Sequence, residues 1–531
     1  MPALCALALI LVALWCAACP GAPSASEDAG TSAGRPDAGP PEHDAGPPPP
    51  RCAPGAVGSA AILEGELLDL RLVCTTGLAD VALSTGPLPE GAALEEREGA
   101  LHLLWPTGLD DATVVEVLVR AAALEEEGTL RLSVADASLD PANVPPLDPT
   151  TYTEEHGLPV IFLDHEPAAE EYEADLVIAG GHRYTAASAK LRGASSLGYP
   201  KRSFTLKLDM NDRLELPAVG FTDRKKVVLI STFDDNAYVR QRLAYQVYNR
   251  TQPGAAHTMV ESASVVLYVG GRYFGLYTLA DHVDRDLFEE SLGLGDGGNL
   301  YKSIDHNANF RRERFPPGSG DKDFLGEGYE LRDEPDLPVG QWDDLVALVA
   351  FVNDADDPTF DAQLEQHIAV DDVLAWWIFA TTVVGEDSYG KNAYLYREGT
   401  GATFRYAPWD FNHSFGQAWE SSRTDPLTPV DEGWPLVTNQ VWERLLRSPV
   451  HGPALWEAYR DALSGPLSLE EVLGLFDAMS AEVDAGARKD EAVWGQAYRD
   501  YFARPDLQDF EGELDYTRAW IEARWAYLDG L

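Results

Sequence analysis

Apolar and polar residues alternate along residues 52–136, which is the pattern of strands that bury one face. The alternation recurs in four runs, which are Leu68-Leu70-Leu72, Leu101-Leu103-Trp105, Val115-Val117-Val119 and Leu130-Leu132-Val134. Turn residues separate these runs, as at Gly86-Pro87 and Thr107-Gly108. Short alternating runs between turns are typical of an antiparallel sandwich. We therefore expect a small all-β domain over residues 52–136.

The pattern becomes mixed beyond a proline-rich linker at residues 137–157. Apolar runs at residues 160–163 and 227–230 predict buried strands. Residues 264–279 predict a hairpin, because two apolar runs flank a Gly-Gly turn. Together with the helical patterns that follow, these runs predict an α+β domain over residues 158–531.

Helical spacing of apolar residues dominates the second half of the chain. It covers most of residues 341–384 and returns after Asp410. An earlier helix is predicted just after Asp234-Asp235-Asn236, which has the composition of a helix N-cap.

The N-terminus has the features of an export signal. Residues 3–18 are apolar but too short for a comfortable membrane span, and Ala17-Ala18-Cys19 resembles a bacterial lipobox. We expect residues 1–19 to be a signal segment and Cys19 to carry a lipid, which would be the membrane attachment of a cell-envelope lipoprotein. The alternative is ordinary signal cleavage and secretion. Residues 20–51 are rich in Pro, Gly and Ala and predict a disordered linker.

Two cysteines remain after this region, Cys52 and Cys74. In an exported protein we expect them to pair and to link the first strands. The run from Leu88-Pro89-Glu90-Gly91 to Trp105-Pro106-Thr107 loosely resembles Ig-like modules of bacterial surface proteins. Such modules are more often spacers than binding domains.

The chain is strongly acidic, with a formal net charge of −47 and an isoelectric point near 4.4. Such a charge repels phosphate backbones and excludes nucleic acid as an expected partner. Residues 190–242 differ, because they hold eleven basic and six acidic residues. This local excess predicts an anion site, or else basic groups that pair with the acidic surface.

A loop of small residues, Gly193-Ala194-Ser195-Ser196, precedes a predicted strand at residues 203–208. Such a loop lets backbone N–H groups approach phosphate oxygens, and Lys207 near the end of the strand could reach them as well. The alternative is a tight hairpin with its lysine in solvent. Gly293, Gly295 and Gly298 match a dinucleotide motif, but they follow a helical pattern and precede a strand, so we reject that site. Lys302 remains a further candidate for phosphate contact.

Two motifs carry the candidate chemistry. Asp387 and Asn392 are five residues apart, and a predicted hairpin connects them to Pro408-Trp409-Asp410-Phe411. One carboxylate could take the proton of an attacking hydroxyl while the amide and the second carboxylate hold Mg²⁺. The protein-kinase catalytic loop has the same spacing, although the His-Arg pair that usually precedes its aspartate is absent here. Taken singly, each residue also fits a capped turn.

The chain from about residue 158 to 520 resembles the CotH family of secreted or surface-associated atypical protein kinases. Four blocks carry the resemblance in order along the chain. They are Arg192-Gly193-Ala194-Ser195-Ser196 with Pro200-Lys201-Arg202-Ser203-Phe204 and Lys207; Phe233-Asp234-Asp235-Asn236 with Arg240; Leu267 to Tyr277; and Asp387 and Asn392 with Pro408-Trp409-Asp410-Phe411.

The resemblance implies a two-lobe kinase-like fold that binds ATP with Mg²⁺, with Mn²⁺ as the alternative metal. It implies Asp387 as the catalytic base and Asn392 and Asp410 as metal ligands. The phosphates would be contacted by a set of residues around the small-residue loop. This set is Arg192, Gly193, Ser195, Ser196 and Lys207, with Lys201 as the reserve lysine.

Two departures from the family pattern stand out. Asp281 takes the place of a glutamate that could pair with the lysine, and Asn412 replaces a common aspartate. Either change could lower metal affinity or mark a degenerate enzyme. We expect an exported, monomeric protein kinase that transfers the ATP γ-phosphate to Ser or Thr of surface or secreted proteins. The alternative is a kinase-fold surface lipoprotein that acts as a binding or structural scaffold.

Overall fold

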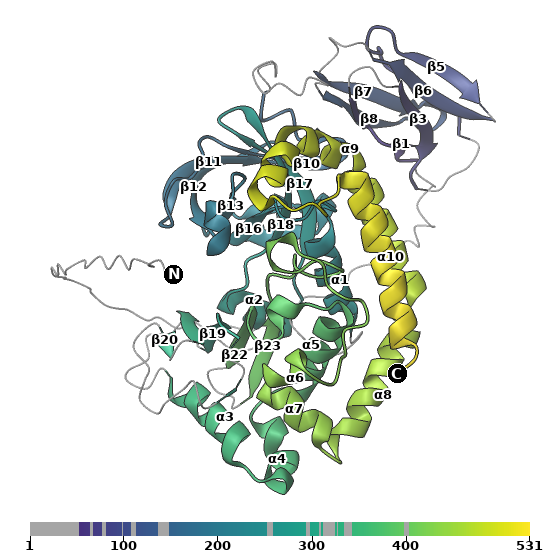
Figure 1. Cartoon of the computed structure of the whole chain (residues 1–531). Coiled ribbons are helices and arrows are strands. Elements are labelled where there is room, and N and C mark those ends of the chain that lie inside the picture. The colour runs from purple at the N-terminus through teal and green to yellow at the C-terminus, as the bar shows by residue number, and fades with distance from the viewer. Residues whose placement is uncertain are drawn as a thin grey trace, which may run out of the picture. The chain divides into compact units, whose positions relative to one another are not determined.

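The structure is a computed structural model that describes most of the chain from Cys52 onward (Figure 1). The described residues are 52–63, 67–76, 81–97, 99–107, 113–135, 148–251, 259–293, 298–306, 310–311, 324–325, 328–333, 342–397 and 403–531. The predicted signal segment, Cys19 and the first linker lie outside them. Within the described residues, strands and helices are mixed, which confirms the α+β class.

Two four-stranded sheets form the first folded region. Their strands are β1 (Pro54–Val57), β3 (Leu67–Cys74), β6 (Ala100–Pro106) and β5 (Ala93–Arg97) in one sheet, and β2 (Ala61–Leu63), β8 (Glu126–Ala135), β7 (Thr113–Ala121) and β4 (Ser84–Thr85) in the other. The alternating residues identified in the sequence, such as Leu70, Leu103, Val117 and Leu132, are fully buried in one cluster. Cys52 and Cys74 form a disulfide. The Ig-like description of this region remains a prediction.

The next region contains an eight-stranded sheet that closes on itself, because β10 pairs with both β17 and β11. In order, its strands are β11 (Glu173–Ala179), β12 (His182–Arg192), β13 (Ser203–Lys207), β16 (Lys226–Ser231), β18 (Arg272–Asp281), β17 (Ser262–Val269), β10 (Leu158–Leu163) and β9 (Glu154–Glu155). Apolar side chains from these strands, including Ile161, Phe204 and Leu229, form one buried cluster. Strand β10 is buried at every residue, which explains its continuous apolar run. Beside this sheet, β14 (Leu214–Leu216) and β15 (Phe221–Arg224) form a small hairpin.

A second, five-stranded sheet carries the predicted hairpin between the two motifs. Its order is β20 (Phe324–Leu325), β21 (Tyr329–Asp333), β19 (Asn299–Ser303), β22 (Ala393–Arg397) and β23 (Phe404–Pro408). Strands β22 and β23 pair with Ala393 opposite Pro408. This register places the residues just outside the hairpin, Asn392 and Trp409, next to each other. The Trp409 N–H donates to the Asn392 carbonyl at 2.9 Å.

Helices build the remainder of the structure. They are α1 (Arg240–Thr251), α2 (Arg285–Leu292), α3 (Asp343–Asp354), α4 (Asp357–Gln363), α5 (Val370–Thr382), α6 (Trp434–Val437), α7 (Gln440–Arg447), α8 (His451–Ser464), α9 (Leu469–Phe502) and α10 (Phe510–Leu528). Helix α5 is almost entirely buried and leads directly to Asp387. None of the helices in the described ranges is long and apolar enough to span a membrane.

A buried ion pair fastens α9 to the closed sheet. The Lys201 ammonium donates to Asp490 Oδ1 and to the Leu276 carbonyl, both at 2.7 Å, and to Thr232 Oγ1 at 2.9 Å. Lys201 and Asp490 are 0% and 1% exposed. Burial lowers the pKa of Lys201 and raises that of Asp490, and the opposite charge of each partner counteracts the change. Lys201 therefore has a structural place in the fold.

We expect Lys201→Met to lower the free energy of unfolding by about 3–5 kcal/mol, because Asp490 would remain buried without its partner. The double variant Lys201→Met with Asp490→Leu should recover much of this loss. The matched control is Arg488→Met, on the same helix as Asp490. The ion pair of Arg488 with Asp484 is half exposed and should contribute about 1 kcal/mol or less. Urea unfolding would measure all three variants. An effect of Lys201→Met no larger than the control would contradict the structural role.

Candidate functional site

A cavity of about 780 Å³ lies where the closed sheet meets the second sheet and the loops of the two motifs. It is lined by residues of β12, β13 and β16, by the small-residue loop after β12, and by β19 and β21. The loops that contain Asp387 and Asp410 complete the lining. This volume is in the range of small-molecule binding sites.

The carboxylate of Asp387 is held from several sides. Lys391 Nζ lies 2.9 Å from Oδ1, and Asn392 Nδ2 donates to Oδ2 at 3.0 Å. His306 Nε2 and His413 Nδ1 lie 3.7 Å and 3.9 Å from the same two oxygens. Burial opposes ionisation, but the nearby imidazoles of His306 and His413 and the charge of Lys391 hold the pKa of Asp387 well below its ordinary value. Asp387 is therefore a fixed, ionised acceptor.

Asn392 and Asp410 both have left-handed backbone conformations, with φ of 57° and 64°. Asn and Asp tolerate this region better than other non-glycine residues, and such conformations often occur at functional sites. The Ser388 hydroxyl donates to the Asp410 carbonyl at 3.2 Å, which ties the second motif to the first. The structure thus brings Asp387, Asn392 and Asp410 to one cavity.

The oxygen atoms of Asn392 and Asp410 fit a Mg²⁺ site. Asn392 uses its amide nitrogen to bind Asp387, which leaves its oxygen for another contact. Within the described ranges, the Asp410 carboxylate forms no hydrogen bond or ion pair. No group of three or more His, Cys, Asp or Glu residues in those ranges could hold a metal alone. Mg²⁺ typically takes one or two protein carboxylates and completes its shell with substrate phosphates and water, so these residues suffice.

Positive side chains gather on the wall of the same cavity. Arg192 lies over the Trp409 ring at 4.3 Å. Burial and the nearby charge of Arg332 lower the pKa of Lys302 to about 8. Among the residues described, the Lys302 ammonium has no hydrogen bond or ion pair, and lies 5.9 Å from the centre of the Tyr394 ring. A buried ammonium that forms no direct ion pair with a described residue is suited to bind an anion.

A second lysine on this wall has a carboxylate partner. Lys226 Nζ lies 3.2 Å from Asp284 Oδ2, and His282 Nδ1 lies 3.4 Å from the same oxygen. Asp284 also caps α2 by accepting from the Leu287 N–H. Burial raises the pKa of Asp284, but the stronger combined effect of His282 and Lys226 lowers it to about 2. Lys226 and Asp284 therefore form a fixed ion pair within the cavity.

Most of the expected phosphate-contacting residues line the cavity, namely Arg192, Gly193, Ser195 and Ser196. Gly193 has a φ of 136°, and a Cβ there would collide with the Ser196 side chain. The close turn of this loop therefore requires glycine.

Lys207, Lys201 and Asp281 do not line the cavity. Lys207 shares a strand face with Ser203 and Thr205, and these two residues do line the cavity. Lys207 lies two residues further along the strand, roughly 6–7 Å beyond Thr205. Its ammonium lies 5.6 Å from the centre of the ring of Tyr172, which itself lines the cavity. Lys201 is occupied by Asp490. The family pattern led us to expect Asp281 beside a phosphate-binding lysine. Asp281 instead pairs with Arg224 at 2.7 Å.

The sequence did not identify several residues of the site. Lys391 follows Asp387 by four residues, so its proximity could have been suspected. The sequence predicts Asp234 only as part of a helix cap, yet Asp235 accepts from the Arg240 N–H at the start of α1 while Asp234 lines the cavity. His413 bonds to Asp234, and although burial opposes protonation, the nearby carboxylates of Asp234 and Asp387 raise the pKa of His413 to about 10.

Comparisons with known proteins agree on one family. A family model described as CotH kinase protein matches residues 189–528. The "Inner spore coat protein H" of Bacillus subtilis (strain 168) is 24% identical over 317 residues, which cover 58% of this chain and 78% of that protein. The matched range contains Asp387, Asn392, Asp410 and Lys302.

The basic side chains of Arg192, Lys226 and Lys302 in the cavity lead to a binding prediction that requires no catalysis. We expect inorganic triphosphate to bind the protein, and Lys302→Met to weaken this binding roughly tenfold or more, because a charge-assisted bond is lost. Lys207→Met is the matched control, since it removes the same group outside the cavity, and it should change the affinity by about twofold or less. Isothermal titration would measure both. Equal losses from the two substitutions would contradict the assignment of the anion site to Lys302.

Proposed function

Because this chain belongs to the CotH kinase family, we propose that it is an exported atypical protein kinase. It transfers the γ-phosphate of ATP to Ser or Thr hydroxyls of surface or secreted proteins. The observation that carries the proposal is the convergence of Asp387, Asn392 and Asp410 on one cavity whose lining also holds the basic side chains of Arg192, Lys226 and Lys302. These are the parts that phosphoryl transfer requires, namely an acceptor for the hydroxyl proton, metal ligands and groups that bind phosphate.

Asp387 orients the attacking hydroxyl and accepts its proton. The low pKa of Asp387 makes it a weak base toward a free hydroxyl. In the loose transition state of phosphoryl transfer, the hydroxyl becomes strongly acidic only as its bond to phosphorus forms, so a weak base is sufficient. Lys391, at 2.9 Å from Asp387, is placed to neutralise charge on the transferred group.

The phosphates would lie against the part of the cavity wall that carries Arg192, Lys226 and Lys302. Lys302 and Arg192 would contact their oxygens, and the backbone of Gly193–Ser196 would cover them. Asn392 and Asp410 would hold Mg²⁺, which neutralises charge on the phosphate oxygens when bound. The Lys226–Asp284 pair would fix a further lysine near the nucleotide, and so supplies the lysine–carboxylate pair that was expected at Lys207 and Asp281.

The arrangement of elements supports a two-lobe kinase-like domain. The closed sheet contributes the small-residue loop, while the residues after α5 contribute Asp387 and Asp410, and the cavity lies between these two contributions. The β region before residue 136 would be an Ig-like spacer. Export is supported by the N-terminal sequence, and the relative named as a spore coat protein fits a surface location.

The Ig-like module and Asp281 are compatible with the scaffold alternative, and Asp281 and Asn412 are the departures from the family pattern that could mark a degenerate enzyme. Both side chains are occupied in the fold. Asp281 binds Arg224 and accepts from the Glu261 N–H, and Asn412 binds Asp234. Each departure therefore has a structural role of its own in this chain.

Asp387→Asn tests the base. We expect the purified chain to label itself with radioactive ATP in the presence of Mg²⁺ or Mn²⁺, and the variant to lose this labelling by about 10²–10⁴-fold. The change preserves shape and should leave nucleotide binding intact, which a thermal shift with ATP and metal would show. If the parent shows neither labelling nor a thermal shift, the scaffold function is favoured instead.

Asp410→Ala tests the metal site. We expect this variant to lose metal-dependent nucleotide binding, because Asp410 is the candidate carboxylate ligand. Titration with ATP, with and without Mg²⁺, would separate the metal-dependent part from the part due to Lys302 and Arg192. An ATP affinity that equals the parent's at saturating Mg²⁺ would contradict the metal assignment.

A further inference from the structure

The carboxylate of Asp234 joins two parts of the chain that are far apart in sequence. Its Oδ2 atom accepts from the Tyr199 hydroxyl at 3.1 Å, which belongs to the loop that follows β12. The same atom accepts from Asn412 Nδ2 at 2.8 Å and lies 3.3 Å from His413 Nε2. Asp234 is 5% exposed. One buried oxygen atom therefore holds both the candidate phosphate loop and the segment after Asp410.

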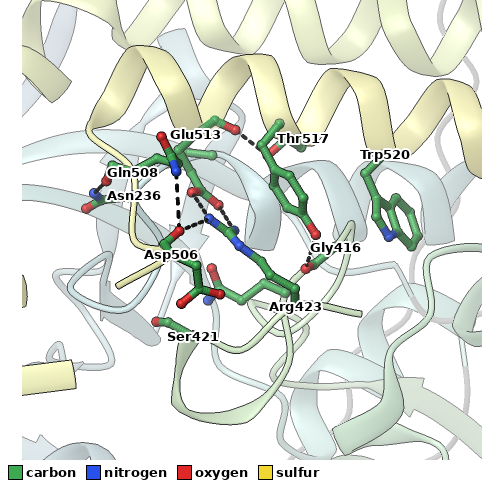
Figure 2. A network of polar contacts seen from close by, with 12 residues as sticks. Asn236, Gly416, Ser421, Arg423, Asp506, Gln508, Glu513, Thr517 and Trp520 are labelled. Atoms are coloured by element: carbon green, nitrogen blue, oxygen red, sulfur yellow. Dashed lines mark hydrogen bonds and ion pairs between the residues drawn. The ribbon is translucent and has the colours of Figure 1, made fainter. Parts of the chain in front are cut away.

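The neighbouring residue, Asp235, holds the other end of that segment through a second chain of contacts. Asp235 Oδ1 pairs with Arg240 at 2.7 Å, and Arg240 pairs with Glu513 on α10 at 2.5 Å. Glu513 also binds both terminal nitrogens of Arg423, at 2.6 Å and 2.7 Å. Figure 2 shows Arg423 facing Glu513 from the loop below α10. Residues 412–423 are thus fixed at both ends to an adjacent pair of aspartates.

The middle of the same segment is held in a strained conformation. Gln417 and Ser421 both donate to the Asp234 carbonyl. Glu420 and Ser421 have φ of 58° and 53°, which is unfavourable for residues other than glycine. Such strain persists only where the surroundings over-determine the conformation, and it is common at functional sites. The segment is therefore built to one specific shape beside the cavity.

Asn412 has a clear chemical reason to be an amide in this setting. A carboxylate at this position would meet the Asp234 carboxylate at hydrogen-bond distance, and two like charges so close cannot both remain ionised without a large cost. The amide instead donates a hydrogen bond to a charged acceptor, which is among the stronger types. The bond directs the Asn412 nitrogen to Asp234.

We propose that Asn412 is a positioning residue whose bond to Asp234 fixes the segment after Asp410 and holds His413 beside Asp387. His413 Nδ1 lies 3.9 Å from Asp387 Oδ2, so a shift of this segment changes the surroundings of the candidate base directly. Asn412 itself acts as a hydrogen-bond donor and not as a metal ligand. The role at Asp387 rests on the proposed function, whereas the pairing with Asp234 does not.

An exchange of the two side chains tests the pairing. We expect Asn412→Asp to lower the midpoint of thermal unfolding, and Asp234→Asn in the same chain to restore most of the loss, because an amide again faces a carboxylate. Gln366→Glu is the matched control, since it adds the same charge at an exposed site and should leave the midpoint unchanged. If Asn412→Asp fails to fold, recovery of folding in the double variant supports the pairing. Independent effects of the two substitutions, or a double variant that also fails to fold, would overturn it.

Metal binding and kinetics test the proposed role of Asn412 as a positioning residue. A carboxylate at a metal position should tighten Mn²⁺ binding, so the donor role predicts no gain in Mn²⁺ affinity for Asn412→Asp in the presence of ATP. We also expect its kcat to fall about 10²-fold through misplacement of the site, with little change in KM for ATP. Tighter Mn²⁺ binding or an unchanged kcat would overturn the positioning role. A parent chain without phosphoryl transfer would overturn the proposed function, and the unfolding exchange would still decide whether Asn412 pairs with Asp234.

Discussion

Arg240 is the buried charge on which the two halves of the site depend. Its side chain is 0% exposed and lies between the carboxylates of Asp235 and Glu513. Burial alone would lower the pKa of this arginine, but the two carboxylates more than offset the effect and raise it. A buried ion pair of this kind adds little net stability, yet removing one partner is costly because the other charge remains buried. The arrangement therefore favours one geometry strongly over others, and that geometry places Asp234 at the cavity.

The basic stretch between residues 190 and 242 left two alternatives, an anion site or pairing with acidic groups, and the structure contains both. Lys190, Arg192 and Lys226 line the cavity. Lys201 and Arg240 form ion pairs with buried carboxylates of α9 and α10. Local charge in a sequence identifies neither outcome, because Asp490 and Glu513 lie 289 and 273 residues from their basic partners.

The parts of the site that sequence alone could predict are those linked by local structure. Asp387, Asn392 and Asp410 are connected through one short hairpin, so pattern and spacing were sufficient to bring them together. Lys207 shows the limit of such reasoning. The strand period gives the face of a side chain, but the position along the strand that reaches the cavity depends on packing of other elements. Lys226 and Asp234 reach the site only through long-range pairing of sheets and loops, which no local pattern encodes, whereas Lys302 was already a candidate from the sequence.

The long sequence separations within these contacts determine when the site can form during synthesis. Lys201 and Asp490 are 289 residues apart, and Arg240 and Glu513 are 273 apart. A growing chain that has completed the closed sheet and the hairpin would still lack Asp490, the partner of Lys201, and Glu513, the second partner of Arg240. Those charges can be buried only after α9 and α10 have been made, since isolated buried charges are too costly. The contacts that fix Lys201 and Arg240 are consequently completed only when the C-terminal helices dock.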